Sequence, residues 1–547
     1  MSAHIYGPMQ IRPIVNKVPP QTSIGDLLHD LLPTLVSDSP ILIQAGTGAG
    51  KTRAILDELV PYAVDHGQKI LFISSRAAIS AQFKTNLARA VGQECILTDY
   101  TPEGLRKLEE IGPVQVQTFH ALWCKLESHT IDLQTFDYMV WDEIHALALD
   151  STFVPYTGEL LKWVIRAAEG IRRIYLSATP EPILDKLTEW GGLPPLTVYQ
   201  WKTRYDQFLL HFYNNFKDLV HRFRAMPGEE HALIFVSSIR EGEALLKLLP
   251  GSQLLTSKTR TNDSSKWQQL LTTQTLPARI TVATTTLDAG VSLTDPQLKH
   301  IVCESLDFAQ IVQEAGRKRL KSGEKLNLYL KDPTRQQLGN RLKRVSETLE
   351  NLGECEKNQN TFVRRFILGE EQPELRSMCL SHKQLAYPWD ETLKILYGNP
   401  RFFMKFDVNP LAIEYLQQQV SLYSALLASK DERPFEKYIC KCFGQPLPTD
   451  SSRWLDGRFD TANRDKFWKF IVENSGKTFS EKDDQEKFSS EFKASYTAAY
   501  GPRKGDRSDR GWGASIIKGV LAQHNRGYKL QTDKKGWRLV DSRQQSA

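Results

Sequence analysis

Residues 41–60 read ILIQAGTGAGKTRAILDELV, which is a short apolar run, a glycine-rich turn and an amphipathic stretch. This order predicts a buried strand, a loop and a helix. Glycines let the backbone N–H groups of such a loop face bound phosphates, and the helix N-terminus adds its positive dipole end. The sequence therefore predicts a nucleotide-binding loop with the ligands Gly46, Thr47, Gly48, Ala49, Gly50, Lys51 and Thr52.

Two side chains of this loop have distinct predicted roles. Lys51 suits a bridge between the β- and γ-phosphates, and the Thr52 hydroxyl suits Mg²⁺. Ala45 stands where the strict pattern has glycine. The alternative, a glycine-rich turn that binds nothing, is disfavoured by the Gly50-Lys51-Thr52 sequence.

Short apolar runs rich in β-branched residues alternate with longer amphipathic stretches between about residues 40 and 335. Continuous hydrophobicity is typical of strands buried on both faces of a parallel sheet, so the pattern predicts doubly wound α/β domains. A break at residues 191–195 (GGLPP) predicts a boundary between two lobes near residue 200. The predicted strands are 41–44, 69–74, 114–118, 138–142, 172–178, 232–238, 278–284, 300–305 and 326–330.

Two acids follow the apolar run 138–141. The C-terminal end of a strand beside a phosphate-binding loop faces the nucleotide. We therefore expect Asp142 to hold Mg²⁺ and Glu143 to orient and deprotonate the attacking water. Two adjacent acids after a strand more often form a solvated turn, and it is the phosphate-binding loop that favours the catalytic interpretation.

Eight motifs appear in an order and spacing that resemble superfamily 2 helicases of the DEAD/DEAH-box class. The resemblance covers roughly residues 22–335, and the combination of motifs is most similar to bacterial members found in phages and mobile elements. The motifs are AGTGAGKT (45–52), SSRAAISAQ (74–82), QTFHAL (117–122), DEIH (142–145), SAT (177–179), FVSS (235–238), VATTTLDAGVSL (282–293) and QEAGRKR (313–319).

The resemblance implies two tandem RecA-like lobes and a role for each matching position. Asp142 and Gly290 would bind the Mg-nucleotide, and His145, Ser177 and Thr179 would couple nucleotide state to the grip on nucleic acid. The catalytic set would be Glu143 together with Gln313, Arg317 and Arg319, which would approach the γ-phosphate from the second lobe. The expected contacts to the nucleic-acid backbone are Arg76, Thr118, Thr284 and Thr285.

Three departures from the family pattern leave alternatives open. The last motif usually reads Q-R-x-G-R-x-x-R, but here Glu314 replaces the first arginine and Leu320 stands at the place of the last. Either Arg317 or Arg319 could be the arginine that stabilises the transition state, and the alternative is a solvated basic face. Gly290 is followed by Val-Ser rather than x-Asp, and the absence of a convincing upstream glutamine motif leaves the nucleotide base open.

The chain is expected to contain five segments: an N-terminal arm (1–21), lobe 1 (22–200), lobe 2 (201–335), a helical accessory region (336–454) and a basic module (455–547). Residues 501–547 hold 11 Lys/Arg and 4 Asp/Glu, whereas the whole chain has a net charge of only +6. A basic end on a nearly neutral body indicates either a polyanion-binding element or a solvated tail.

Residues 512–540 predict an amphipathic helix followed by a hairpin around TDKKG, so the end of the chain suggests a winged-helix-like module. Its predicted phosphate contacts are Lys518, Arg526, Lys534 and Lys535. Trp512, Tyr528 and Trp537 could stack on bases or form the module's core. For Tyr528 and Trp537, which alternate along strands, the core is favoured.

The composition is that of a globular protein, with 41% hydrophobic and 24% charged residues. Because no apolar run reaches about 20 residues and no leader is evident, we expect a cytoplasmic protein without a membrane segment. Seven scattered cysteines predict free thiols, and a metal cluster of Cys355, Cys379, Cys440, Cys442 and His382 is disfavoured by its spacing.

The sequence therefore predicts an ATP-dependent, Mg²⁺-requiring helicase or translocase that acts on nucleic acid, with DNA favoured over RNA. The alternative is a nucleotide-switched clamp that binds nucleic acid or a protein without processive unwinding. A small-molecule kinase is disfavoured, because it would leave the motifs of the second lobe without a purpose.

Overall fold

A computed structural model divides the chain into two compact units, one made of residues 1–204, 288–292 and 340–424 and the other of residues 205–287, 293–339 and 425–547. The structure describes residues 12–37, 39–93, 104, 107–167, 170–192, 194–203, 205–214, 216–256, 270, 273–284, 292–321, 323–358, 373–386, 389–390, 395–396, 401–431, 433–447, 461–500, 511–524, 527–533 and 535–542.

Lobe 1 is a sheet in which every pairing except the antiparallel β4–β5 pair is parallel. Its strands are short and apolar because both faces of the sheet are buried. In spatial order they are β1 (Ile14–Val18), β8 (Thr197–Trp201), β2 (Ile41–Gln44), β7 (Arg172–Ser177), β6 (Tyr138–Asp142), β3 (Ile70–Ser74), β5 (Val114–Thr118) and β4 (Glu110–Ile111).

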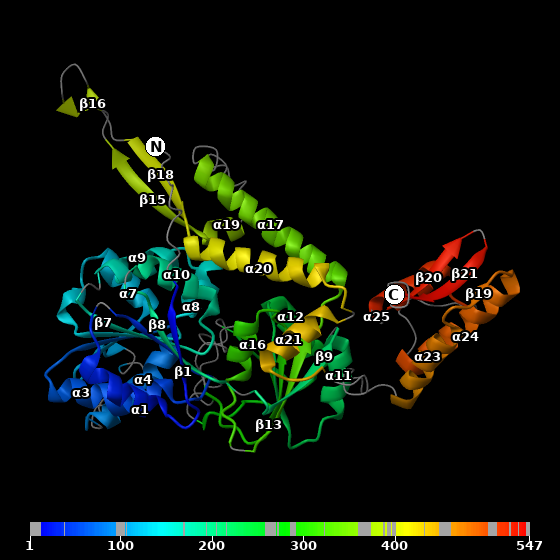
Figure 1. Cartoon of the computed structure of the whole chain (residues 1–547), viewed down its shortest axis with the longest axis horizontal. Helices are drawn as coiled ribbons and strands as arrows, with labels where there is room; N and C mark the ends of the chain where they lie inside the picture. Colours follow the sequence, from blue (N-terminus) through cyan, green and yellow to red (C-terminus); the bar gives the residue numbers. More distant parts are fainter. Residues whose placement is uncertain are drawn as a thin grey trace, which may run out of the picture. The chain divides into compact units, whose positions relative to one another are not determined.

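Successive residues of the central strands enter two different cores, as the strand period of two requires. Ile70 and Phe72 belong to one cluster, whereas Leu71 and Ile73 belong to the other. The first cluster is covered by α1 (Ile24–Leu31), α2 (Lys51–Ala54), the π-helical turn η2 (Ile55–Leu59), α3 (Val60–Asp65) and α4 (Ala77–Ala90). The second is covered by α7 (Phe119–Glu127), α8 (Ala146–Leu149), α9 (Thr157–Ala167) and α10 (Glu181–Gly191) (Figure 1).

Lobe 2 holds a second sheet, whose pairings are all parallel. Its spatial order is β11 (Gln253–Leu255), β12 (Ile280–Ala283), β10 (His231–Phe235), β13 (Leu298–Cys303), β14 (Leu326–Lys331) and β9 (Phe208–Tyr213). Helices α11 (Phe216–Ala225) and α12 (Ile239–Leu248) pack their apolar faces on one side of this sheet. A further helix, α16 (Phe308–Ala315), leads toward Arg317.

The two-lobe α/β fold is confirmed, and all nine predicted strands are present. Sequence reasoning missed β1, β8, β9 and β11, which are edge or near-edge strands with partly exposed, less continuous apolar patterns. Because β1 pairs with β8, part of the predicted N-terminal arm belongs to the sheet of lobe 1.

The region predicted as mainly helical also contains a long antiparallel ribbon, so that prediction was incomplete. Strands β15 (Cys379–Ala386) and β18 (Arg401–Val408) pair along their whole length, with the short pair β16 (Trp389–Asp390) and β17 (Ile395–Leu396) between them in sequence (Figure 1). The helices are α17 (Arg335–Lys357), α19 (Pro373–Ser377), α20 (Pro410–Ala428) and α21 (Pro434–Phe443). The strands of a ribbon have an apolar period of two residues, not the 3.6-residue period of a helix. Aromatic residues are frequent along this stretch, and they obscured the two-residue period.

The C-terminal module consists of helices and a three-stranded antiparallel sheet with the order β19–β21–β20. Its elements are α23 (Thr461–Asn474), β19 (Thr478–Phe479), α24 (Lys482–Tyr500), α25 (Ala514–His524), β20 (Tyr528–Asp533) and β21 (Gly536–Asp541). Trp512 is 2% exposed and Tyr528 is 8% exposed, and both belong to the module's hydrophobic core, so of the two alternatives left open for Trp512 the core holds. The predicted helix and hairpin are present, whereas the winged-helix assignment stays a prediction.

Candidate functional site

The glycine-rich loop of lobe 1 leaves the buried strand β2 and enters α2. Gly50 caps this helix with φ = 91°, a left-handed conformation that glycine adopts without steric cost. A Cβ on Gly46 would lie 2.8 Å from Thr203 Cγ2, so only glycine fits where the loop passes Thr203. Glycine is therefore required in this loop for two reasons: the backbone at Gly46 passes close to Thr203, and Gly50 adopts a left-handed conformation.

Lys51 lies inside the curve of this loop. Its ammonium donates to the carbonyl oxygens of Ala45 at 2.8 Å and Gly46 at 3.2 Å, and the residue is only 6% exposed. A positive charge thus lies within the ring of backbone groups where phosphate oxygens would be bound. Beyond α2 the helix contains the π-helical turn η2, a feature that is often found near functional sites.

Thr52 and Asp142 meet although they are 90 residues apart in the sequence, with Thr52 Oγ1 donating to Asp142 Oδ2 at 3.2 Å. Asp142 ends β6 and is 5% exposed. A hydroxyl and a carboxylate oxygen side by side are the hard ligands that Mg²⁺ prefers, so the residues present fit this metal. The predicted pair of magnesium ligands is brought together.

Glu143 follows Asp142 with φ = 53°, in the left-handed region. For a non-glycine residue this conformation costs on the order of 1 kcal/mol or more and is found mostly where function demands it. The strand β6 ends at Asp142, directly before this residue. Glu143 Oε2 lies 3.4 Å from His145 Nδ1.

A buried polar chain continues from His145. His145 Nδ1 lies 2.9 Å from Ser177 Oγ, and the same oxygen accepts a hydrogen bond from the Thr179 amide at 3.0 Å. His145, Ser177 and Thr179 are each at most 2% exposed. Among the described residues, no group hydrogen-bonds the buried Thr179 hydroxyl. The three predicted coupling residues thus form one connected network that begins at Glu143.

The segment that carries these residues matches the model of a known protein family. A family model for the DEAD/DEAH box helicase matches residues 29–187, the segment that contains the loop, both acids and the buried chain. Residues 29–187 therefore resemble a DEAD/DEAH box helicase domain. The domain extends over most of lobe 1 and ends before β8.

A curated relative of this DEAD/DEAH box domain is the probable helicase HelY of Mycobacterium tuberculosis. It is 30% identical over 172 residues, which cover 31% of this chain and 17% of the relative. The match therefore spans about a sixth of the relative's length. No described helix is long and apolar enough to cross a lipid bilayer.

Solved structures with a similar architecture include the Mycobacterium smegmatis helicase Lhr bound to ssDNA and AMP-PNP, which is 18% identical with a TM-score of 0.39 and covers 58% of this chain and 46% of its own. Another is the DEAD-box helicase Mss116 bound to ssRNA and UDP-BeF, at 15% identity, a TM-score of 0.42, and coverage of 61% and 80%. Because these TM-scores are low, the fold assignment rests on the strand order of the two sheets. None of these findings bears on an origin in phages or mobile elements.

Arg76 of the DEAD/DEAH box domain makes an internal ion pair. Its guanidinium contacts both carboxylate oxygens of Asp150, with Nη2 2.6 Å from Oδ1, and the Asp150 side chain is 4% exposed. Asp150 is the C-cap of α8, the short helix that follows the DEIH motif. Contact between Arg76 and a nucleic-acid phosphate, which remains a prediction, would compete with this buried carboxylate.

Thr118 acts as the N-cap of α7, because its hydroxyl accepts a hydrogen bond from the Ala121 amide at 3.1 Å. Such a cap typically contributes about 1 kcal/mol to helix stability. If Thr118 contacts the nucleic-acid backbone as predicted, its hydroxyl oxygen would bond the phosphate while it still accepts from the Ala121 amide.

In lobe 2, Arg317 and Gln313 are held together. Arg317 Nε donates to the Gln313 carbonyl oxygen at 2.9 Å and Nη2 donates to Gln313 Oε1 at 2.8 Å. Arg317 is 8% exposed, whereas Arg319 is exposed. The two candidate arginines thus differ in environment, Arg317 being braced against α16 and Arg319 facing solvent.

The remaining predicted residues fall into two groups. Thr284 follows β12, Lys518 donates to Thr532 Oγ1 at 2.6 Å, and Lys535 is exposed beside the β20–β21 turn. Thr285, Gly290, Arg526 and Lys534 lie outside the described residues.

Sequence reasoning missed Asp150 and Asn409. Asn409 is 2% exposed, and its amide nitrogen donates to the carbonyl oxygens of Ser151 at 3.3 Å and Val154 at 3.1 Å and to Thr157 Oγ1 at 2.9 Å. It ties the accessory region to the segment that follows Asp150. Neither residue belongs to a local motif, so only the position of Asp150 just beyond DEIH offered a signal.

The cysteines agree with the expectation of free thiols at Cys124, Cys303, Cys355, Cys379, Cys440 and Cys442. Within the described ranges, no cluster of three or more His, Cys, Asp or Glu side chains could hold a metal ion. Burial raises the pKa of the Cys440 thiol to about 12, which makes this cysteine a poor thiolate ligand.

Proposed function

We propose that this protein is an ATP-dependent helicase or translocase that couples hydrolysis of Mg-ATP to movement along a nucleic acid. The observation that carries the proposal is the pairing of Thr52 Oγ1 with Asp142 Oδ2 at 3.2 Å beside the Lys51-containing loop. A phosphate-binding loop and a metal-binding carboxylate are brought together from different strands by the fold. This arrangement suits nucleoside triphosphate chemistry.

Each group has a separate task in the proposed reaction. The loop amides and Lys51 bind and orient the phosphates, and Thr52 and Asp142 would hold the metal. When bound, Mg²⁺ supplies charge neutralisation at the β- and γ-phosphate oxygens. Glu143, whose backbone is left-handed, is the proposed base that orients water and accepts its proton.

Coupling would pass from Glu143 through His145 to Ser177 and Thr179. These buried groups share hydrogen bonds, so a shift of Glu143 on hydrolysis would be transmitted to the segment 177–179. Gln313 and one of Arg317 and Arg319 would complete the site when lobe 2 approaches the nucleotide. An arginine supplied in this way is worth about 10³- to 10⁵-fold in rate in other NTPases.

The proposed track is nucleic acid, with DNA favoured over RNA. Arg76, Thr118, Thr284 and Thr285 are the proposed backbone contacts in the lobes. Contacts to phosphate do not read sequence, so binding should be weakly sequence-specific and strongly salt-dependent. In the C-terminal module, Lys518 and Lys535, with Arg526 and Lys534, are the proposed additional contacts.

The test is steady-state ATP hydrolysis by the wild type and by Glu143→Gln, each without polymer and with single-stranded DNA, duplex DNA or single-stranded RNA. We expect one polymer to stimulate turnover and the substitution to lower it by roughly 100-fold or more, as loss of a general base does. Binding of a fluorescent ADP analogue should be retained, because Glu143 is not a proposed phosphate ligand.

Each outcome separates the candidates. Stimulated turnover accompanied by strand displacement supports a helicase, and stimulation without displacement supports a translocase. Basal turnover that no polymer changes would favour the nucleotide-switched clamp. Absence of turnover in the wild type under every condition would overturn the enzymatic proposal.

A further inference from the structure

Arg317 and Arg319 flank a lysine that is buried. Helix α16 ends at Ala315, and the chain then runs extended past Leu293 as a parallel bridge at Lys318. The Leu293 amide donates to the Arg317 carbonyl oxygen at 2.7 Å, and the Arg319 amide donates to the Leu293 carbonyl oxygen at 2.8 Å. The chain is therefore extended at Lys318, directly after the turn at Gly316 and Arg317 that ends α16.

This backbone offers a reason for the unusual arginine spacing. On a helix, residues three apart share a face, whereas on an extended chain residues two apart do so. The pattern that this motif resembles separates its arginines by three positions, but here they are separated by two. Because the segment is extended at Lys318, Arg317 and Arg319 leave the chain on one side and Lys318 on the other.

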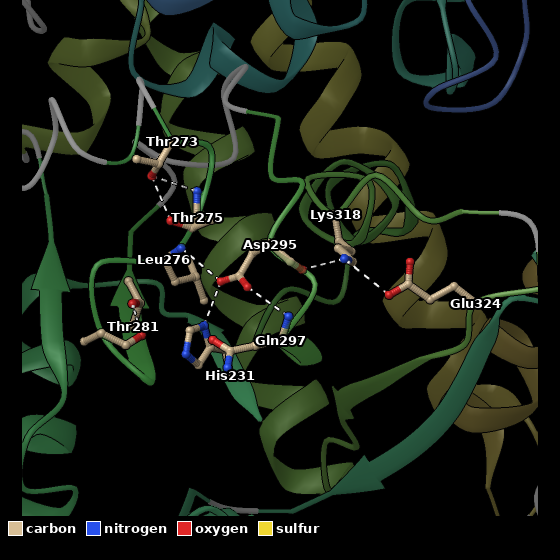
Figure 2. A network of polar contacts seen from close by, with 10 residues as sticks. His231, Thr273, Thr275, Leu276, Thr281, Asp295, Gln297, Lys318 and Glu324 are labelled. Carbon is tan, nitrogen blue, oxygen red and sulfur yellow. Dashed lines mark hydrogen bonds and ion pairs between the residues drawn. The ribbon is translucent and has the colours of Figure 1, made fainter. Parts of the chain in front are cut away.

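The Lys318 side chain is anchored inside lobe 2, as Figure 2 shows. Its ammonium donates to the Asp295 carbonyl oxygen at 2.5 Å and lies 3.3 Å from Glu324 Oε1, and the side chain is 2% exposed. Burial of an ammonium is costly unless partners are fixed around it. Lys318 can therefore hold the Leu293–Lys318 bridge only because the Asp295 carbonyl and the Glu324 carboxylate are themselves restrained.

Asp295 is the more rigid of the two acceptors. Its carboxylate accepts hydrogen bonds from the Gln297 amide at 2.9 Å and the Leu276 amide at 3.0 Å, and His231 Nδ1 lies 2.7 Å from Oδ2 (Figure 2). With 1% exposure, Asp295 cannot exchange these partners for water. Asp295, whose carbonyl oxygen receives Lys318, is thus held by a local turn at Gln297 and by two other segments, at Leu276 and His231.

Glu324 closes the network from the other side. It accepts from the Lys321 amide at 3.1 Å and from Lys299 Nζ at 3.0 Å. Burial acts to raise the pKa of Glu324, but these hydrogen bonds and the charge of Lys318 outweigh it and lower the pKa. The carboxylate is therefore charged at neutral pH and attracts Lys318.

From this arrangement we propose that Lys318 is a positioning residue for hydrolysis, which fixes the extended bridge and thereby directs Arg317 and Arg319 to one side. The inference rests on the proposed function. Lys318 touches no reacting atom and acts through the arginines. A misplacement of a catalytic group by about 1 Å can cost roughly 100-fold in rate.

The experiment compares Lys318→Met with Lys318→Arg and with Lys299→Met. Lys299 pairs with the same Glu324 oxygen, but its side chain is 37% exposed, so it is a matched control for loss of one charge. We expect Lys318→Met to lower kcat by about 10- to 100-fold with KM and ADP affinity unchanged, Lys318→Arg to restore part of the loss, and Lys299→Met to leave kcat within about twofold.

A double-mutant cycle separates positioning from general damage. If Lys318 acts through Arg319 or Arg317, Lys318→Met should lower turnover much less in an Arg317→Ala/Arg319→Ala background than in the wild type. Hydrogen exchange should show faster exchange of the Leu293 and Arg319 amides in Lys318→Met, with β10 and β13 still protected. Loss of protection throughout lobe 2 would instead mean that Lys318 only stabilises the fold.

Two further results would overturn the inference. An unchanged kcat in Lys318→Met would show that the bridge does not need its anchor. If the wild type hydrolyses no nucleotide, the proposed function fails and the positioning role fails with it. A hydrogen-exchange effect confined to residues 293–319 would then identify Lys318 as a purely structural anchor, so the two failures are distinguishable.

Discussion

Replacement of Ser177 by alanine should destabilise lobe 1 more than the same replacement at Ser151, another fully buried serine of this lobe. Ser177 Oγ accepts from the Thr179 amide at 3.0 Å and lies 2.9 Å from His145 Nδ1, and Ser177 is fully buried. Alanine would leave two buried polar groups without this partner. Each such group costs about 1–3 kcal/mol, so we expect a loss of about 2–3 kcal/mol.

The matched control is Ser151→Ala. Ser151 is equally buried, but its hydroxyl bonds a single group among the described residues, the Ala148 carbonyl oxygen at 2.6 Å. Its loss should cost about 1 kcal/mol. For a lobe of this size, 1 kcal/mol shifts Tm by roughly 2–4 °C. Scanning calorimetry should therefore show a fall of about 4–12 °C for Ser177→Ala and about 2–4 °C for Ser151→Ala.

Turnover gives the second measurement. Because Ser177 joins His145 to the Thr179 amide and touches no proposed phosphate ligand, basal ATP hydrolysis should fall less than its stimulation by nucleic acid. Equal Tm values for the two variants would refute the claim that Ser177 satisfies two buried groups. Full retention of nucleic-acid stimulation at 25 °C would refute the proposed coupling through this chain.

Three further predictions follow from contacts outside the nucleotide site. Asn409→Ala should cost about 2–3 kcal/mol and increase proteolysis of the accessory region, whereas the control Asn474→Ala in α23, which removes side-chain hydrogen bonds to the Phe470 carbonyl oxygen and from Lys477 Nζ, should not. Burial acts to raise the pKa of Glu304, but hydrogen bonds from Lys331 and Ser237 hold it below 4.5; Glu304→Gln should cost about 3 kcal/mol at pH 7. A carboxyl group whose pKa is lowered by folding stabilises the fold at pH values above its ordinary pKa. The difference in unfolding free energy between wild type and variant should therefore shrink as pH falls below 4.5. A constant difference in denaturation experiments would contradict this account. Asp150→Asn should weaken the hold on Arg76, raise nucleic-acid affinity several-fold and steepen its salt dependence by about one phosphate contact, and an unchanged salt slope in anisotropy titrations would exclude Arg76 as a phosphate contact.

Most of the nucleotide site could be predicted because its residues are carried by local patterns. Gly46 to Thr52 lie between a buried strand and a helix, and Asp142 lies at the end of another strand. In a parallel sheet the C-terminal ends of strands meet at one edge, so adjacency of Thr52 and Asp142 followed from the topology. The left-handed backbone of Glu143 did not follow, because no residue type there calls for it.

The accessory region and the C-terminal module show where local reasoning weakened. The helix 514–524 and the hairpin after it were predicted correctly, because their periodicity and turn signal are both local. The role of Trp512 stayed open, because an aromatic side chain has the same local signal whether it stacks on a base or packs in a core. The ribbon of β15 and β18 was missed because its pairing joins residues on either side of a long intervening stretch.

The sequence by itself indicated the proposed phosphate-binding loop, the two acids Asp142 and Glu143 and the alternation of strands and helices, since these depend on residues within one or two elements. The tertiary structure decided which polar and charged side chains already have partners. Arg76 meets Asp150 from 74 residues away, Asn409 meets Ser151 from 258 residues away, and Lys318 reaches Asp295 from 23 residues away. A charged side chain carries no local mark of whether it is solvated or buried against a partner, because that depends on the packing that brings distant segments together.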